Sequence, residues 1–169
     1  MAAGNTYVPI ATTTVATQTT TVTFTSIPQT YTDLVCIVTG TVNGNGEPNI
    51  LFNGDNGTNY GWVGLDGYGS GTYSSGLNTT ARAVLGGWLT YWPNSATNTA
   101  TTIVHLLGYS STSIFKNWIS QDNQGSQMVG MYAGTWRSTA AINQITFTFS
   151  NSGQFRVPST VTLYGISAA

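Results

Sequence analysis

The chain has 169 residues, which suits a single domain and is long enough to bury a hydrophobic core without disulfides or metal ions. Hydrophobic residues make up 40% of it, which excludes a disordered chain, but only 5% of its residues are charged and the formal net charge is −1. Because the four basic residues form no cluster, the composition argues against binding to nucleic acid or to anionic membranes. A nearly uncharged surface also gives little repulsion between copies, which permits self-assembly.

The N-terminal residues 1–18 are small and rich in threonine, and Pro9 restricts any strand pairing there to a sheet edge. We expect them to form an extended arm, followed by a single domain over residues 19–169. The chain begins with no basic region followed by an apolar run, and it holds no long apolar stretch. We therefore expect no secretion signal, no membrane span and synthesis in a cytoplasm. The single cysteine, Cys36, lies in an apolar run, which predicts a buried thiol and no internal disulfide.

Short strands account for most of the chain. Alternating threonine and apolar residues predict a half-buried strand over Thr19–Ile27, ended by Pro28. The run Leu34–Val38 is apolar on both faces and predicts a central strand that is covered on each side. Further strands are predicted at Ile50–Phe52, Ala83–Trp92, Thr101–Leu107, Ser113–Ser120 and Gln127–Trp136.

Two segments carry the remaining fold predictions. The glycine-rich segment Asn53–Leu77 shows no sustained period and predicts an ordered loop packed on its own aromatic rings, in which Trp62, Val63 and Leu65 could complete a strand. The segment Ile142–Ile166 alternates in both halves and predicts two strands joined by a turn at Asn151–Gly153. No window shows a helical period, so we predict an all-β fold, an antiparallel two-sheet β-sandwich of the jelly-roll type.

Candidate catalytic groups are few. The only histidine, His105, lies within an apolar strand, where a structural role is usual, and no GxSxG element is present. Serines are plentiful, so the sequence does not exclude a Ser-His-Asp set, and a hydrolase is kept as one alternative. Hydrolysis of a glycoside would need a pair of carboxylates, and the candidates all lie in or beside turns. Hydrogen bonding of these side chains to the turn backbone accounts for their presence without catalysis. The candidates are Asp33, Glu47, Asp55, Asp66 and Asp122.

Metal sites find little support. Asp55, Asn56 and Asp66 could supply oxygen ligands to calcium, but their spacing does not match a regular calcium loop. One cysteine and one histidine do not make a zinc site. We expect no metal and no cofactor.

Aromatic residues concentrate in one third of the chain. Aromatic rings at the rim of a sandwich can stack on sugars or fill a subunit interface, while core packing and loop anchoring are the alternative. The candidate interaction surface consists of Trp62, Tyr68, Tyr73, Trp88, Tyr91 and Trp92.

Two segments near the ends of the domain resemble a known class of protein. The stretch Val22–Leu34, VTFTSIPQTYTDL, and the stretch Phe155–Ile166, FRVPSTVTLYGI, are similar to small virion structural proteins of tailed bacteriophages, including cyanophages. The resemblance implies a β-sandwich subunit displayed on the particle, either as a capsid decoration (cement) protein or as part of the tail or its fibres. Decoration proteins of this kind are often trimers at capsid three-fold positions. Residues 43–100 carry no part of the resemblance.

We therefore expect a structural virion protein without enzymatic activity, located on the capsid surface. It would form a homotrimer, bind the major capsid protein on the outside of the phage head and stabilise the shell. The alternative is a tail or fibre-tip module that binds host-surface carbohydrate through its aromatic loops.

Overall fold

The computed structural model describes residues 6–44, 46–86, 98–124 and 128–167. All regular elements in these ranges are strands. They are β1 (Tyr7–Thr14), β2 (Thr21–Phe24), β3 (Asp33–Gly40), β4 (Val42–Asn43), β5 (Pro48–Phe52), β6 (Tyr60–Tyr68), β7 (Gly71–Thr80), β8 (Ala83–Val84), β9 (Ala100–Leu107), β10 (Lys116–Gln124), β11 (Met128–Trp136), β12 (Ile145–Phe149), β13 (Gln154–Phe155) and β14 (Thr160–Ile166). No helix in the described ranges has the length and apolar character to span a membrane.

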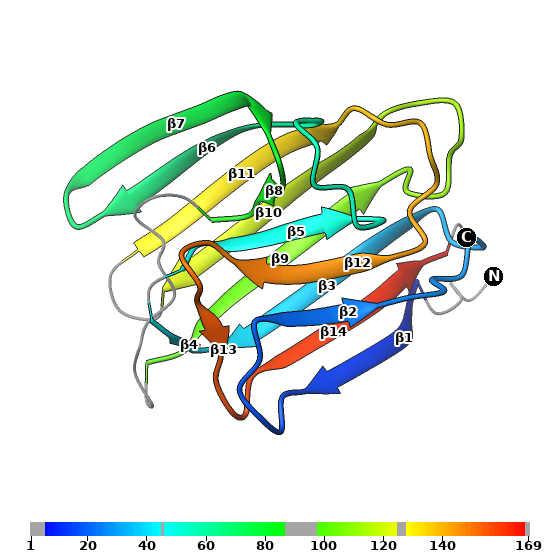
Figure 1. The fold of residues 1–169 in the computed structure, drawn as a ribbon. Coiled ribbons are helices and arrows are strands. Elements are labelled where there is room, and N and C mark those ends of the chain that lie inside the picture. Colours follow the sequence, from blue (N-terminus) through cyan, green and yellow to red (C-terminus); the bar gives the residue numbers. More distant parts are fainter. Residues whose placement is uncertain (1–5, 45, 87–97, 125–127, 168–169) are drawn as a thin grey trace.

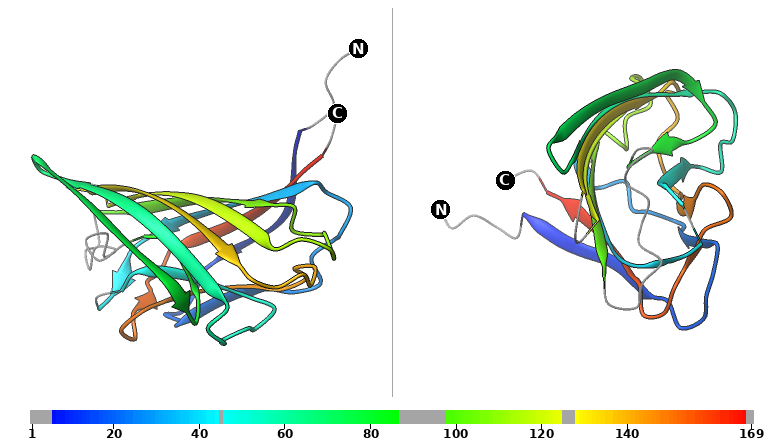
Figure 2. Two further views of the ribbon diagram at one scale, coloured as in Figure 1. Left: turned by 90° about the horizontal axis from the view of Figure 1, so that it is seen from above. Right: turned by 90° about the vertical axis from the view of Figure 1, so that its left-hand side faces the viewer.

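The strands form two main sheets that pack face to face (Figure 1). The large sheet has eight strands in the order β1-β14-β3-β9-β10-β11-β6-β7, and the small sheet has four in the order β2-β12-β5-β8. Strands β13 and β4 form a short ribbon beside them. Figure 2 shows the large sheet curling over the small one. The predicted antiparallel β-sandwich is confirmed, although the two sheets are unequal in size.

The core lies between the sheets, where alternate side chains of each strand point inward. β14 shows the pattern plainly, since Val161 and Leu163 are buried and the alternating Thr160 and Thr162 are not. At one end of the core the rings of Phe52, Tyr60 and Trp136 pack together, with centroids 5.6 to 6.3 Å apart. Such pairs stabilise beyond the area that they bury.

A glycine makes room for the largest buried side chain in this part of the core. Trp118 of β10 is 1% exposed and lies over Gly134 of β11. A Cβ atom on Gly134 would sit 2.1 Å from the Trp118 ring and 2.6 Å from the carbonyl oxygen of Gly61. The tryptophan can therefore lie against the sheet only because residue 134 has no side chain.

The N-terminal segment takes part in the large sheet. Residues 7–14, within the predicted arm, form the edge strand β1, which pairs with β14 in antiparallel register. Val15, directly after this strand, is buried in the core.

Two predictions about strand connections are wrong. The segment Ile142–Ile166 does not fold into one hairpin, because β12 belongs to the small sheet and β14 to the large one. The turn at Asn151 and Ser152, both with positive φ, leads instead into β13.

The glycine-rich segment Asn53–Leu77 is not a loop throughout, since most of it forms the hairpin β6–β7. The predicted strand Ala83–Trp92 is seen as β8, and its residues from 87 onward lie outside the described ranges.

Candidate functional site

The side of the large sheet that faces away from the small sheet is here called the outer sheet face. Strand alternation and register assign its residues, which form rows that run across the strands. In the central five strands they are Asp33, Val35, Ile37 and Thr39 of β3; Thr101, Ile103, His105 and Leu107 of β9; Asn117, Ile119, Gln121 and Asn123 of β10; Val129, Met131, Ala133 and Thr135 of β11; and Gly61, Val63, Leu65 and Gly67 of β6. None of these residues is a lysine, arginine or glutamate.

Large apolar side chains are exposed on this face. Val63 and Leu65 of β6 are 64% and 62% exposed, and Val129 and Met131 of β11 are 63% and 55% exposed. Ile119 of β10, 44% exposed, continues the apolar area on the next strand. Because monomeric soluble proteins rarely expose contiguous apolar patches of this kind, the area is typical of a binding surface.

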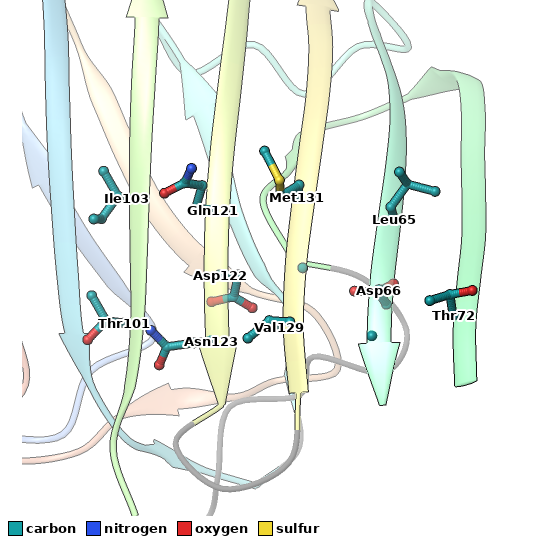
Figure 3. A pocket seen from close by; sticks show the side chains of 12 residues that line it. Leu65, Asp66, Thr72, Thr101, Ile103, Gln121, Asp122, Asn123, Val129 and Met131 are labelled. Atoms are coloured by element: carbon teal, nitrogen blue, oxygen red, sulfur yellow. The ribbon is translucent and has the colours of Figure 1, made fainter. Parts of the chain in front are cut away.

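A shallow groove crosses the outer sheet face. Its volume is about 710 Å³, and residues of β9, β10, β11, β6 and β7 line it. Figure 3 shows one row in which Ile103, Gln121, Met131 and Leu65 lie on four successive strands, in agreement with the register. The lining is mostly apolar, with single amide and hydroxyl groups among the apolar side chains. Such a lining can bind an apolar protein surface and form hydrogen bonds with a few backbone groups of that partner.

The electrostatics of the outer sheet face are weak. Of the residues named above, only Asp33 and His105 have ionisable side chains. One carboxylate oxygen of Asp33 is already engaged, because it accepts a hydrogen bond of 2.7 Å from the backbone N–H of Gly108. Ionic attraction therefore contributes little to any complex that this face forms.

The structure divides the predicted aromatic surface. Trp62 points to the inner side of β6, is half-buried, and has its ring 5.9 Å from that of Tyr132. Tyr68 and Tyr73 are 44% and 51% exposed at the far end of the β6–β7 hairpin. Since Trp62 and Tyr68 are six residues apart on one strand, about 20 Å, the three rings do not make one stacking platform. The remaining members, Trp88, Tyr91 and Trp92, lie outside the described residues.

Two of the five acidic residues lie on the inner side of the large sheet. Asp66 and Asp122 flank Gly130 in the strand register and are 4% and 3% exposed. Tyr132 donates a hydrogen bond from its hydroxyl to Asp66, and Thr102 donates one of 2.5 Å to Asp122. Burial raises the pKa of Asp66, although the bond from Tyr132 opposes this. Both residues are among those that line the outer groove. Strand alternation, however, directs their buried side chains to the inner side of the sheet, so they border the groove mainly through their backbone.

Asp55 has a structural role in the loop before β6. Its Oδ1 accepts a hydrogen bond of 2.8 Å from the backbone N–H of Gly57, and its Oδ2 accepts bonds from the side chains of Asn59 and Trp136. Asp66 lies well along β6 from this loop, about 20 Å beyond Tyr60, so the two carboxylates of the imagined calcium set are not brought together. In the described ranges, no three or more His, Cys, Asp and Glu side chains gather where they could hold a metal ion.

His105 lies on the outer sheet face and is exposed. Its opposite neighbours across the strands are Val35 and Ile119, and its neighbours along β9 on the same face are Ile103 and Leu107. None of these four can serve as a nucleophile or as an orienting carboxylate.

Sequence reasoning missed the apolar residues of the outer sheet face. A signal for them exists in β11, where Met128-Val129-Gly130-Met131-Tyr132 is apolar in both phases of the strand alternation. The same signal in Leu34–Val38 correctly predicts a central strand, but there too the outer side faces away from the small sheet. In β11 it marks a strand whose outer side chains have no cover within the described part of this chain.

No protein-family model, no curated protein and no solved structure matches the chain.

Proposed function

We propose that this protein is a structural, non-catalytic subunit of a bacteriophage particle. It decorates the outside of the head, contacts the major capsid protein and stabilises the shell. The resemblance of residues 22–34 and 155–166 to virion proteins supports the class of particle. The apolar and almost uncharged outer sheet face is the one structural observation on which the docking part of the proposal depends.

The size of the outer sheet face fits a protein partner. Eight strands at spacings of about 4.8 Å, with about seven residues of about 3.3 Å each, give roughly 34 Å by 23 Å, close to the 800 Å² that each partner buries in a standard interface. Val63, Leu65, Val129 and Met131 would form the apolar centre of the contact. Because hardly any charges take part, binding should change little with ionic strength.

A binding experiment with phage heads that lack this protein tests the proposal. Heads are mixed with wild type, with Met131→Glu or with Thr25→Glu, and the bound protein is measured after sedimentation. Met131→Glu should lower the affinity at least about tenfold, because it places a carboxylate in the apolar centre of the contact. Thr25→Glu is the matched control, since it adds the same charge at an exposed position just after β2, away from the outer sheet face.

Two results would contradict the proposal. Equal binding of Met131→Glu and wild type would show that the outer sheet face is not the docking surface. Release of the wild-type protein by moderate salt would show that ionic contacts hold it, which this face cannot supply.

A carbohydrate-binding module of a tail or fibre tip is the second candidate. Tyr68 and Tyr73 favour it, because they are exposed diagonal neighbours on the same side of the β6–β7 hairpin, and two adjacent rings can stack on a sugar. The double variant Tyr68→Ala/Tyr73→Ala should then lose binding to host cells and keep its fold. Absence of binding to any host glycan by the wild-type protein would remove this candidate.

A further inference from the structure

The outermost strand of the large sheet has an unprotected edge. Among the residues that the structure describes, β7 pairs with β6 on one side only, and it borders the sheet in Figure 1. Its ten residues, GTYSSGLNTT, include no proline and no charged residue, and residues 72–79 are all exposed. A long, uncharged edge strand of this kind presents a row of backbone donors and acceptors to any other strand.

The other sheet edges in the described part of the chain are protected. The opposite edge of the large sheet, β1, contains Pro9 and is irregular between Pro9 and Ala11. The small sheet ends in β2 and β8, which have four residues and two residues. Proline, bulges and short length are the usual means by which proteins prevent edge pairing. β7 has neither proline nor short length, and its one irregularity, in the pairing with β6 between Tyr60 and Trp62, lies beyond the regular stretch Gly71–Leu77.

The geometry of the hairpin shows which backbone groups are free. Tyr68 and Gly71 flank a two-residue turn whose first residue, Gly69, has a φ of 56°. This closing pair is hydrogen-bonded in such a turn, and antiparallel pairs alternate from there, so Thr72, Ser74 and Gly76 direct their N–H and C=O groups away from β6. The register with β6 is unbroken from Gly71 to Leu77. Beyond it, Arg137 donates a hydrogen bond to the carbonyl oxygen of Asn78.

We propose that β7 pairs with β7 of a second copy of this chain, antiparallel and across a two-fold axis at Ser74. This register centres the overlap on the regular stretch Gly71–Leu77 and forms about six backbone hydrogen bonds between the copies. Tyr73 and Leu77, which are exposed on one side of β7, would be partly covered by the second copy.

A second copy is the occupant that the surface properties favour. β7 has no charge for a partner of opposite charge to recognise, and no charge that would repel the same strand of another copy. An antiparallel edge that pairs with itself makes an isologous contact, which closes after two copies. The result is a dimer, in place of the trimer that the resemblance implies. The pairing goes beyond the proposed function and can be tested without capsids.

Cysteine cross-linking of the purified protein tests the pairing. The native Cys36 is fully buried and should not form a cross-link in the folded protein. In the proposed register the two Ser74 Cα atoms are about 5.5 Å apart, within the range for a disulfide, so Ser74→Cys should give a cross-linked dimer on mild oxidation. Thr12→Cys on β1, an exposed position on the opposite edge strand, is the matched control and should stay monomeric.

Sedimentation provides the second measurement. Wild type and Ser74→Thr should show a concentration-dependent dimer, whereas Ser74→Pro should be a monomer with an unchanged circular dichroism spectrum, because proline removes only an N–H that points away from β6. A wild-type monomer at millimolar concentration, a trimer, or equal cross-linking of Ser74→Cys and Thr12→Cys would overturn the proposal. If Ser74→Pro fails to fold, the cross-linking result decides alone.

Discussion

Replacing Asp55 should destabilise the protein far more than its position in a surface loop suggests. The carboxylate accepts three hydrogen bonds, from the backbone N–H of Gly57 at 2.8 Å, from Nδ2 of Asn59 at 2.9 Å and from Nε1 of Trp136 at 2.6 Å. Trp136 is 2% exposed and its ring packs on Phe52 and Tyr60. Asp55 therefore connects the loop before β6 to the aromatic end of the core.

The magnitude of the Asp55→Ala effect follows from these contacts. Leaving the buried indole N–H of Trp136 without an acceptor costs about 1–3 kcal/mol, and the lost bond to Gly57 about 1 kcal/mol. The exposed Asn59 amide can bind water and adds little. We expect a loss of about 3 kcal/mol in the free energy of unfolding, which for a chain of this length lowers the melting temperature by about 6 to 12 °C.

Urea unfolding followed by tryptophan fluorescence measures this change. Asp55→Asn should cost less than Asp55→Ala, because the amide can turn its carbonyl oxygen toward Asn59 and Trp136 and then loses only the hydrogen bond from Gly57. Asn56→Ala, at an exposed neighbour in the same loop, should stay within about 0.5 kcal/mol of wild type. A loss below about 1 kcal/mol for Asp55→Ala would refute the reasoning, since that is less than the smallest cost of an unpaired buried N–H and the lost Gly57 bond together.

The same contacts give Asp55 a pH dependence. Burial raises the pKa of its carboxyl, but the hydrogen bonds from Trp136, Asn59 and Gly57 outweigh this and hold the pKa below its usual value. The folded state therefore binds this proton less tightly than the unfolded state. Its stabilisation is present above the ordinary aspartate pKa of about 4 and is lost as the pH falls through the lower folded value. Wild type should thus lose its advantage over Asp55→Ala in acid.

Two further predictions concern the core. Gly134→Ala should lower the free energy of unfolding, measured in urea, by about 1–3 kcal/mol or more, because its Cβ would overlap the Trp118 ring and the Gly61 carbonyl. An unchanged urea midpoint would contradict this packing. Burial raises the pKa of the Cys36 thiol far above its usual value, so at neutral pH a thiol reagent should label this residue only at the rate of global unfolding. Labelling that is fast in native buffer would show that the strand β3 opens locally.

The sequence predicts the sandwich well where apolar and polar residues alternate against one core. β2, β12 and β14 follow this rule, because their inward positions are apolar and the positions between them are mostly threonine. The continuous apolar run of β3 correctly predicts a central strand, which lies between β14 and β9, but the predicted cover on each side is not seen, because Ile37 and Thr39 on its outer side are only half-buried. In the other three strands local pattern and tertiary burial agree.

The hairpin β6–β7 escaped prediction because its pattern is reversed. On β6 the inward positions 64 and 66 are Gly64 and Asp66, while the outward positions 63 and 65 are Val63 and Leu65. Gly64 is required there because the Tyr132 ring lies directly over it, and Asp66 is accommodated because Tyr132 donates to it. A small inward residue and a polar one, each matched to a ring on the next strand, cannot be recognised without knowledge of that neighbour.

The hairpin connection of β12 and β14 was also wrong, for a different reason. Each strand alternates correctly, and the turn at Asn151 and Ser152 has the positive φ values expected of a tight turn. Alternation records only that one face of a strand is dry, however, and the two sheets of a sandwich bury their dry faces against the same core. A strand of either sheet therefore shows the same pattern, and the sheet to which it belongs is decided by long-range pairing.

The reversed pattern of β6 also connects the two proposed surfaces. Val63 and Leu65 belong to the outer sheet face and at the same time border the free edge of β7, so pairing of two β7 strands would place two outer sheet faces side by side. Copies held next to each other on a shell would pair at a raised effective concentration, and a pair would dock with two faces at once. The two contacts would then strengthen each other, although they use different groups: backbone donors and acceptors at the edge and apolar side chains on the face. Met131→Glu acts on the face alone and Ser74→Pro on the edge alone, so the failure of either proposal can be recognised separately.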